Sequence, residues 1–152
     1  MEHNHKIFNI NEFEILQNAQ NSFQQNAAYL LVVTILVCLN FYLIRRAREL
    51  NMPAYGKIMT TIFGLMTINF GWTVGTFLRG TQNDMAFRLS ELKSKGTEIS
   101  AASESWIEFM GNPTSPAMAS SPDLPTMLFW GLLALMLVAG MWAPVPEGTY
   151  EK

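Results

Sequence analysis

Charged residues are absent from three long stretches of the chain and are concentrated between them. The uncharged stretches cover residues 27–44, 58–78 and 124–142 and contain 18 to 21 residues each. An apolar helix of that length crosses the ~30 Å hydrocarbon core of a bilayer. The stretches are too long and continuous for barrel strands, so helices must satisfy their backbone in lipid. The pattern therefore predicts an all-α integral membrane protein with three transmembrane helices, in direct contact with the lipid bilayer.

Two polar segments flank the first span. Residues 1–26 are rich in Asn and Gln, and Asn11 with Glu14 three residues later resembles a capping box. One interpretation is a helix that begins near Glu12 and runs into the span, and the other is a frayed tail. After the span, residues 45–57 form a short basic loop, whose Asn-Met-Pro sequence breaks the helix.

A long polar connector, residues 79–123, separates the second and third spans. Arg79 and Gly80 are expected to end the second helix. Apolar residues at helical spacing then predict two short amphipathic helices, over residues 83–95 and 98–110. These helices would form a small cap outside the bilayer or lie flat on it.

The third span has recognisable limits. Asp123 is a suitable N-cap, and Pro125 suits the first turn of a helix. Residues 143–152 are expected to form a short exposed tail.

Composition supports a membrane protein and excludes some partners. Apolar residues make up 49% of the chain and charged residues 14%, whereas soluble domains have about 25% charged residues. The net charge is -2 and no Lys/Arg cluster has interleaved aromatics, so we expect no nucleic-acid partner. The single cysteine, Cys38, cannot form an internal disulfide and is expected to be an apolar filler.

The basic residues around the first loop predict the orientation. Counted over all loops and tails, Lys and Arg divide equally between the two sides. Position breaks the tie, because three arginines directly follow the first span in a short loop. We therefore expect a cytoplasmic loop, with the N-terminus outside and the C-terminus inside; its topology-setting residues are Arg45, Arg46, Arg48 and Lys57.

The second span is unusually rich in small and polar residues. At 100° per residue, one narrow stripe contains Thr60, Gly64, Thr67, Gly71 and Gly75. Two glycines four residues apart allow two helix backbones to approach closely. This stripe is a predicted helix-packing seam, either within the chain or between copies of it.

The opposite side of the second span is polar in a different way. Asn69, Thr73 and Thr76 lie there, and Asn69 is the predicted polar membrane contact because an amide facing lipid is unfavourable. Two opposed non-lipid faces would let the helix touch its own bundle and a neighbouring subunit. Asn40, in the first span, is expected near the membrane–water interface.

The spans contain no Asp, Glu, Lys, Arg or His, which disfavours a channel or an ion-coupled transporter. His3 and His5 form a weak pair near the N-terminus, so no metal site is predicted. No Ser–His–acid group, paired carboxylates or phosphate-binding glycine loop is evident. We therefore expect no catalytic residues, no cofactor and no enzyme activity from this chain alone.

The small size, three spans and N-out, C-in topology resemble the class I holins of bacteriophages, although no sequence motif is shared. That resemblance implies self-assembly in the bacterial cytoplasmic membrane and the formation of large holes. It would make Gly64, Gly71, Gly75 and Asn69 hole-lining or oligomerising positions. The connector before residue 124 is longer than is usual for that family, and the tail is less basic.

The alternative is a non-catalytic accessory subunit of a larger membrane complex, such as a respiratory complex or a virion membrane. In that case other membrane subunits would be its partners. The cap over residues 83–110, and not the second span, would then make the main contacts.

Overall fold

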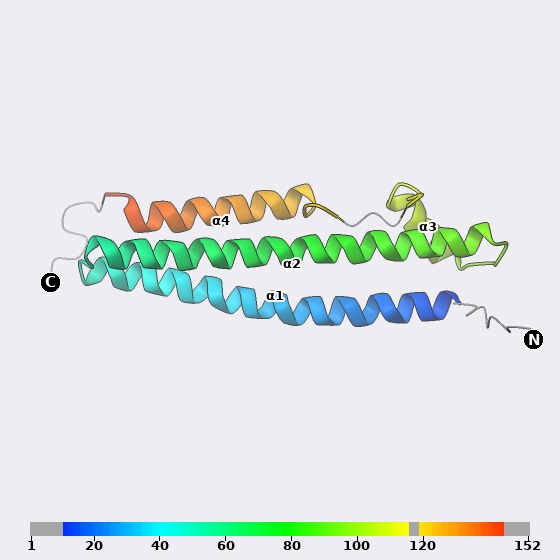
Figure 1. The fold of residues 1–152 in the computed structure, drawn as a ribbon, viewed down its shortest axis with the longest axis horizontal. Helices are drawn as coiled ribbons and strands as arrows, with labels where there is room; N and C mark the ends of the chain where they lie inside the picture. Colours follow the sequence, from blue (N-terminus) through cyan, green and yellow to red (C-terminus); the bar gives the residue numbers. More distant parts are fainter. Residues whose placement is uncertain (1–10, 116–118, 145–152) are drawn as a thin grey trace, which may run out of the picture. The chain divides into compact units, whose positions relative to one another are not determined.

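The computed structural model describes residues 11–115 and 119–144, and this part of the chain contains four α-helices and no strand. α1 covers Glu12–Glu49, α2 Ala54–Ser94, α3 Ala101–Phe109 and α4 Leu124–Trp142 (Figure 1). α1, α2 and α4 are long and apolar enough to cross a membrane. The fold is therefore all-helical with three membrane-length helices. His3, His5 and most of the predicted C-terminal tail lie outside the described residues.

α1 is one continuous helix of 38 residues, so the polar segment before the first span is helical from Glu12 onward. The capping box is confirmed. The Glu14 N–H donates to the Asn11 Oδ1 at 2.9 Å, and the Asn11 N–H donates to a Glu14 carboxylate oxygen at 3.3 Å. These two bonds satisfy backbone donors that the start of a helix otherwise leaves free. The structure therefore agrees with the interpretation of this segment as a helix that begins near Glu12, and not with a frayed tail.

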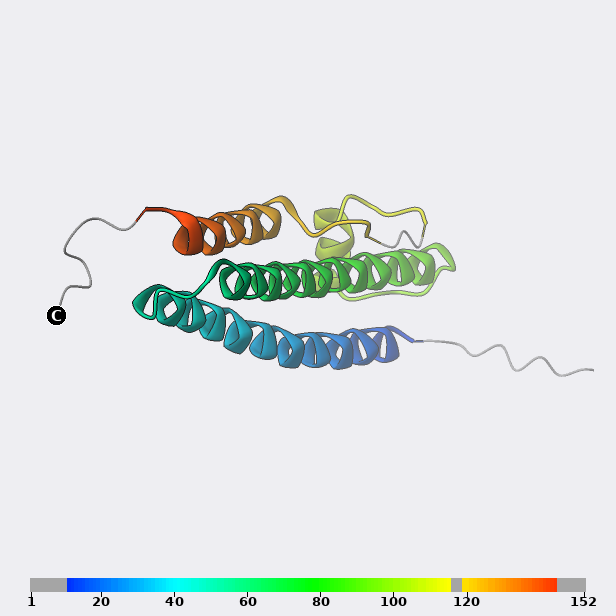
Figure 2. The ribbon, with the colours of Figure 1, turned by 60° about the vertical axis from the view of Figure 1, so that its left-hand side comes forward.

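The turn between α1 and α2 is much shorter than the predicted loop over residues 45–57 (Figure 2). Arg45, Arg46 and Arg48 belong to the end of α1, and Lys57 belongs to the first turn of α2. The loop prediction was wrong in extent because basic side chains end an apolar run without ending a helix. Positive charge is in fact favourable at a helix C-terminus.

α2 continues for 41 residues, straight through Arg79 and Gly80. The prediction that these residues end the second helix was therefore wrong, and the connector predicted over residues 79–123 begins as helix. A single glycine inside a helix costs only about 1 kcal/mol relative to alanine. The amphipathic segment predicted over residues 83–95 is the end of α2 and not a separate helix.

The remaining helices have clear starting signals. Ser100 is the N-cap of α3, and its hydroxyl accepts a hydrogen bond from the Ser103 N–H at 3.3 Å. Asp123 is the N-cap of α4, and its carboxylate accepts from the Thr126 N–H at 3.3 Å. The expected N-cap of the third span is thus confirmed, and α4 has the limits that the uncharged stretch predicts.

The chain divides into two compact units. Unit 1 contains Met1–Gln25 and Leu78–Ala119, and unit 2 contains Asn26–Phe77 and Ser120–Lys152. α1 and α2 contribute residues to both units.

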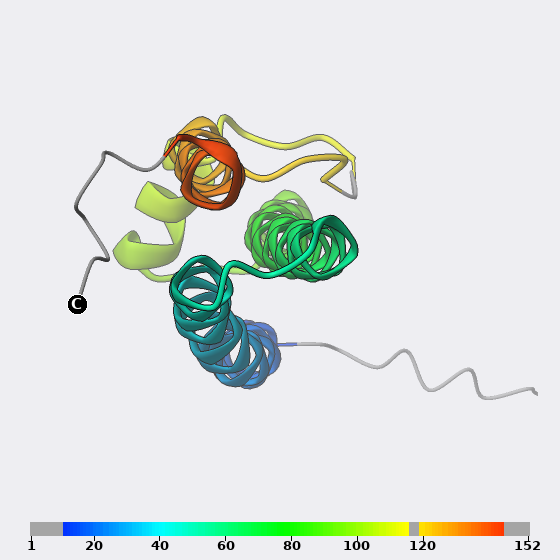
Figure 3. The ribbon, with the colours of Figure 1, turned by 90° about the vertical axis from the view of Figure 1, so that its left-hand side faces the viewer.

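Unit 2 is a bundle formed by parts of α1 and α2 together with α4. Viewed end on, the three helices occupy the corners of a triangle (Figure 3). Buried apolar side chains from all three helices form its core: Val33, Ile44, Ala47, Ile68, Val74, Trp130, Leu137 and Met141. The exposed side chains of α4 are almost all apolar, including Leu128, Leu132 and Leu135, which is typical of a surface that faces lipid.

Unit 1 packs α3 against the start of α1 and the end of α2. Its core is small and consists of Ile15, Ala19, Met85, Leu89 and Ile107. Leu89 is fully buried. The outer surface of this unit carries most of the charged side chains that the structure describes.

Candidate functional site

The predicted stripe of small residues on α2 lies inside unit 2. Gly64, Thr67 and Gly71 are buried, while Thr60 and Gly75 are half-buried. The glycines face side chains of α4 and α1 of the same chain. The structure thus uses this stripe for packing within one chain.

Gly71 meets the largest side chain of the bundle core. The indole of Trp130, on α4, is 3% exposed and occupies the space that a Cβ on Gly71 would need. Glycine therefore permits the close approach of α2 to the ring. This contact excludes even one extra methyl group on α2 at this level of the bundle.

The other two glycines of the stripe are also tightly packed. A Cβ on Gly75 would lie 2.9 Å from a methyl carbon of Thr126 and 3.3 Å from Pro122. A Cβ on Gly64 would lie 3.3 Å from the Asn40 Oδ1 and 3.4 Å from a methyl carbon of Leu137. A side chain at either position would therefore require the neighbouring side chains to shift.

A buried hydrogen bond connects α1 to α2 in the same region. The Asn40 Nδ2 donates to the Thr67 Oγ1 at 3.0 Å and to the Leu36 carbonyl at 2.8 Å. Asn40 is fully buried, so its side chain lies between α1 and α2, and its expected depth near the membrane–water interface stays a prediction. Its Oδ1 has no hydrogen-bond partner in the described structure and faces Gly64.

Asn69 points away from the bundle. Its side chain is exposed, and among the described residues its carboxamide makes no hydrogen bond. Thr73, one turn further on, is also exposed but donates to the Asn69 backbone carbonyl at 3.0 Å. Of the polar face predicted opposite the glycines, Asn69 and Thr73 are thus exposed, while Thr76 is half-buried and donates to the Trp72 carbonyl at 2.9 Å.

The end of α1 carries three arginines in two different roles. Arg45 and Arg46 are exposed and both approach the Glu49 carboxylate, at 2.8 and 3.4 Å. The hydrogen bond from Arg45 is the main cause that lowers the pKa of Glu49 below its ordinary value, with a smaller contribution from Arg46. Such surface pairs stabilise a fold only slightly.

Arg48 instead binds the end of α4. Its guanidinium donates to the Gly140 carbonyl and, at 2.6 Å, to the Ala143 carbonyl. The last carbonyls of a helix lack partners within the helix, and a cation there also interacts favourably with the helix dipole. Nearby, the Trp142 Nε1 donates to the Thr61 Oγ1 at 3.1 Å. These bonds hold the ends of α1 and α4 and the start of α2 together.

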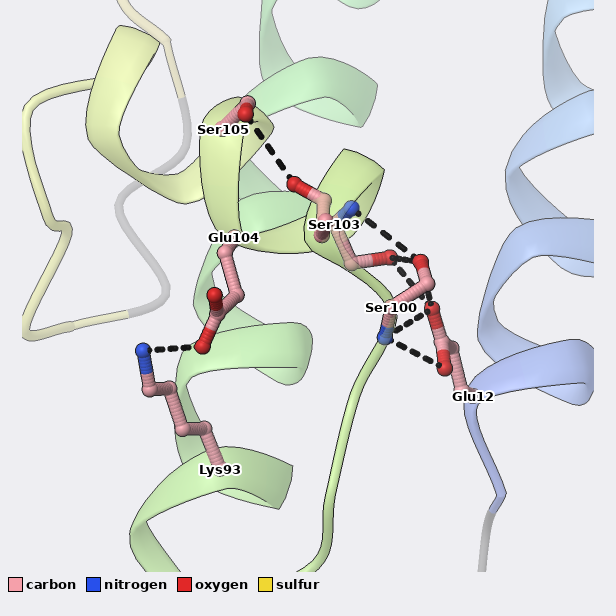
Figure 4. A network of polar contacts seen from close by, with 7 residues as sticks. Glu12, Lys93, Ser100, Ser103, Glu104 and Ser105 are labelled. Carbon is pink, nitrogen blue, oxygen red and sulfur yellow. Dashed lines mark hydrogen bonds and ion pairs between the residues drawn. The ribbon is translucent and has the colours of Figure 1, made fainter.

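In unit 1, a carboxylate holds the N-terminus of α3 (Figure 4). The Ser100 hydroxyl and the Ser103 hydroxyl both donate to Glu12 at 2.6 Å, and the Ser100 N–H donates to the same carboxylate at 3.1 Å. The hydroxyl bond from Ser100, followed by that from Ser103, lowers the pKa of Glu12. An ion pair between Lys93 and Glu104 at 2.7 Å fastens α3 to α2 as well.

A groove between α1 and α2 opens on the surface of unit 1. Its volume is about 370 Å³. Both apolar and polar side chains line it, including Ile15, Asn18, Ser22, Met85 and Arg88. Arg88 is paired with Asp84 at 2.8 Å. Within residues 11–115 and 119–144, no three His, Cys, Asp or Glu side chains gather as they would around a metal ion.

Sequence reasoning missed the residues that complete these contacts. Periodicity identified the glycine stripe but not Trp130 as its neighbour, because a helical wheel gives a face and not what lies opposite it. The stripe of small residues that includes Gly71 and the presence of a bulky Trp in another span were the only signals in the sequence for this contact. The sequence patterns indicate Arg48 only as a topology-setting residue and Glu12 only as the start of a helix, and they do not predict the contacts of either residue with another helix.

No protein-family model, no curated protein and no solved structure matches this chain.

Proposed function

We propose that this chain is a self-assembling integral membrane protein that forms holes between its copies, in the manner of the holins it resembles. The observation that supports this proposal most is the tight packing of unit 2. Gly64, Gly71 and Gly75 bring α2 close to its neighbours. The bundle of one chain is thus closely packed at these levels, and permeability would require several chains.

The chemistry of the bundle agrees with this proposal. The polar side chains buried in unit 2, Asn26, Asn40 and Thr67, are uncharged. Proton relays and ion-coupled transport depend on ionisable residues at membrane depth. A membrane protein of this kind acts by assembly and not by moving a proton or an ion through its own core.

The test is to express the chain alone in a bacterium with a membrane-impermeant dye in the medium. We expect a delay followed by sudden dye entry, which collapsing the membrane potential brings forward. Cells that express an unrelated three-span membrane protein at the same level are the control. Normal growth without dye entry, with this chain recovered from the membrane fraction, would contradict the proposal.

The second candidate function is that of an accessory subunit in a larger membrane complex. Unit 1 favours it, because a hole does not require a packed polar unit with a surface groove. The Phe109 side chain, stacked near Trp106 with ring centroids 5.7 Å apart, is 79% exposed and suits a protein contact. A subunit would be inert when expressed alone and would purify in a fixed ratio with one membrane protein of its native host, a ratio that Phe109→Ser would lower.

A further inference from the structure

One side of α2 carries a continuous ridge of exposed side chains. Its members follow one another at spacings of three or four residues, and all are exposed: Ile62, Met66, Asn69, Thr73 and Phe77. Residues three and four apart are neighbours on a helix surface. The ridge is therefore one surface, with bulky apolar side chains on both sides of an amide and a hydroxyl.

Asn69 lies close to the middle of the uncharged stretch over residues 58–78. At that depth a bilayer offers no water to replace a missing hydrogen bond. The carboxamide has two donors and one acceptor oxygen, none of which is bonded in the described structure. A partner at the same depth would satisfy them.

We infer that this partner is Asn69 of a second copy, and that two chains pair through the ridge of α2. Copies inserted by the same route have the same orientation, so equal residues lie at equal depth. An amide is both donor and acceptor, so two of them across a two-fold axis can exchange one N–H···O hydrogen bond in each direction. The chain has one other amide within its uncharged stretches, Asn40, which is fully buried and bonded to Thr67. Asn69 is therefore the amide that a second copy presents.

The flanking residues suit the same arrangement. Thr73 is smaller than its neighbours Met66 and Phe77 on the ridge, and small residues near a polar contact let membrane helices approach. The glycine stripe is occupied by α4 and α1, so it is not available for this contact. The inference rests on the proposed self-assembly and names the surface that it uses.

Disulfide cross-linking in native membranes tests the pairing. In a Cys38→Ser background, Thr73→Cys places a thiol one turn from Asn69, and Leu135→Cys places one on the exposed surface of α4 as the matched control. Mild oxidation is expected to give a covalent dimer at position 73 and little at position 135. Equal cross-linking at both positions would overturn the inference.

The role of the amide is tested in the same assay. Asn69→Leu is expected to lower cross-linking at position 73 roughly three- to fifteenfold, from the usual strength of polar contacts between membrane helices. Asn69→Gln, which keeps both donors and the acceptor, is expected to restore most of it. An unchanged yield in Asn69→Leu would contradict the amide pair. Because Asn69 is exposed, neither variant should alter the thermal unfolding of the chain, which is measured in parallel.

Dye entry in the same cells separates this inference from the proposed function. A dimer at position 73 without dye entry would support the ridge contact and refute hole formation. Dye entry that is unaffected by Asn69→Leu, without a dimer at position 73, would refute the ridge contact and leave hole formation supported.

Discussion

At the scale of single residues, the side chains opposite each α2 glycine determine how much space a larger residue would have there. Gly71 faces a buried indole, Gly64 faces a buried amide, and Gly75 faces Thr126 and Pro122. By contrast, Gly131 on α4 has open space where a Cβ would be. Two glycines in membrane-length helices of the same chain thus differ greatly in the space available for a side chain.

The first prediction concerns Gly71. Gly71→Ala is expected to destabilise the bundle by about 1–3 kcal/mol, because the added methyl group overlaps the buried ring of Trp130 and forces either helix to move. Unfolding of the purified chain in detergent, followed by its tryptophan fluorescence, measures the change.

Gly131→Ala is the matched control for this substitution. It adds the same methyl group to a membrane helix where nothing lies within 4 Å, and alanine favours the helix over glycine. Its stability is expected to equal or slightly exceed that of the original chain. If both variants unfold alike, the Gly71–Trp130 contact does not limit packing.

At the scale of elements, α3 illustrates how a short helix depends on its neighbours. Nine residues are too few for a stable isolated helix in water. Glu12 binds the N-terminus of α3, Lys93 pairs with Glu104, and Ile107 is buried in the core of unit 1. α3 is therefore held by contacts from both of the helices it packs against.

The second prediction is that acid pH weakens the packing of α3 against α1 and α2 in unit 1. A carboxyl whose pKa is lowered in the folded state binds more protons in the undocked state, so its stabilisation rises with pH. For Glu12 the stabilisation is fully present above the ordinary value of 4.5 and is lost as the pH falls below it. The fluorescence of Trp106, obtained by difference from a Trp106→Phe variant, should report this loss as the pH falls below 4.5.

Two variants show whether Glu12 is responsible. Glu12→Gln should remove the transition, because its amide does not titrate. Glu108→Gln, on the exposed surface of α3, should retain it. A transition of the same midpoint in Glu12→Gln would assign the acid sensitivity to another group.

The elements also show what sequence could and could not predict. The limits of α4 were predictable because Asp123, Pro125 and the end of the apolar run are local signals. The continuity of α2 through Arg79 was not predictable from the sequence. A change in composition marks the end of an apolar surface, but backbone hydrogen bonding can continue beyond it. Some contacts join residues that are distant in sequence, and no local pattern specifies them. Examples are the ion pair between Lys93 and Glu104 and the hydrogen bonds from Arg48 to the end of α4.

At the scale of the whole molecule, the ends of α1 and α4 are expected to face the same side of a membrane. Arg48 binds carbonyls at the C-terminal end of α4, so the C-terminal ends of α1 and α4 lie together. If the arginines at the end of α1 are cytoplasmic, as their placement predicts, the end of α4 is cytoplasmic too.

The third prediction is a labelling pattern in intact cells. Single cysteines at positions 45 and 144, in a Cys38→Ser background, should react with a membrane-impermeant maleimide only after the cells are permeabilised. A cysteine at position 105 should react at once, because α3 belongs to the connector on the other side.

Two other patterns would have distinct meanings. Reaction at positions 45 and 144 in intact cells, without reaction at 105, would reverse the orientation. Reaction at only one of positions 45 and 144 would contradict the contact between Arg48 and α4, because it places the two helix ends on opposite sides.

The contact between Gly71 and Trp130 also constrains how this sequence can change over evolution. A larger residue at position 71 has no space unless position 130 becomes smaller at the same time. Natural variants of this protein should therefore change the two positions together, so that a larger side chain at position 71 accompanies a smaller one at position 130. The same compensation is expected between positions 64 and 40, where an amide fills the space beside a glycine.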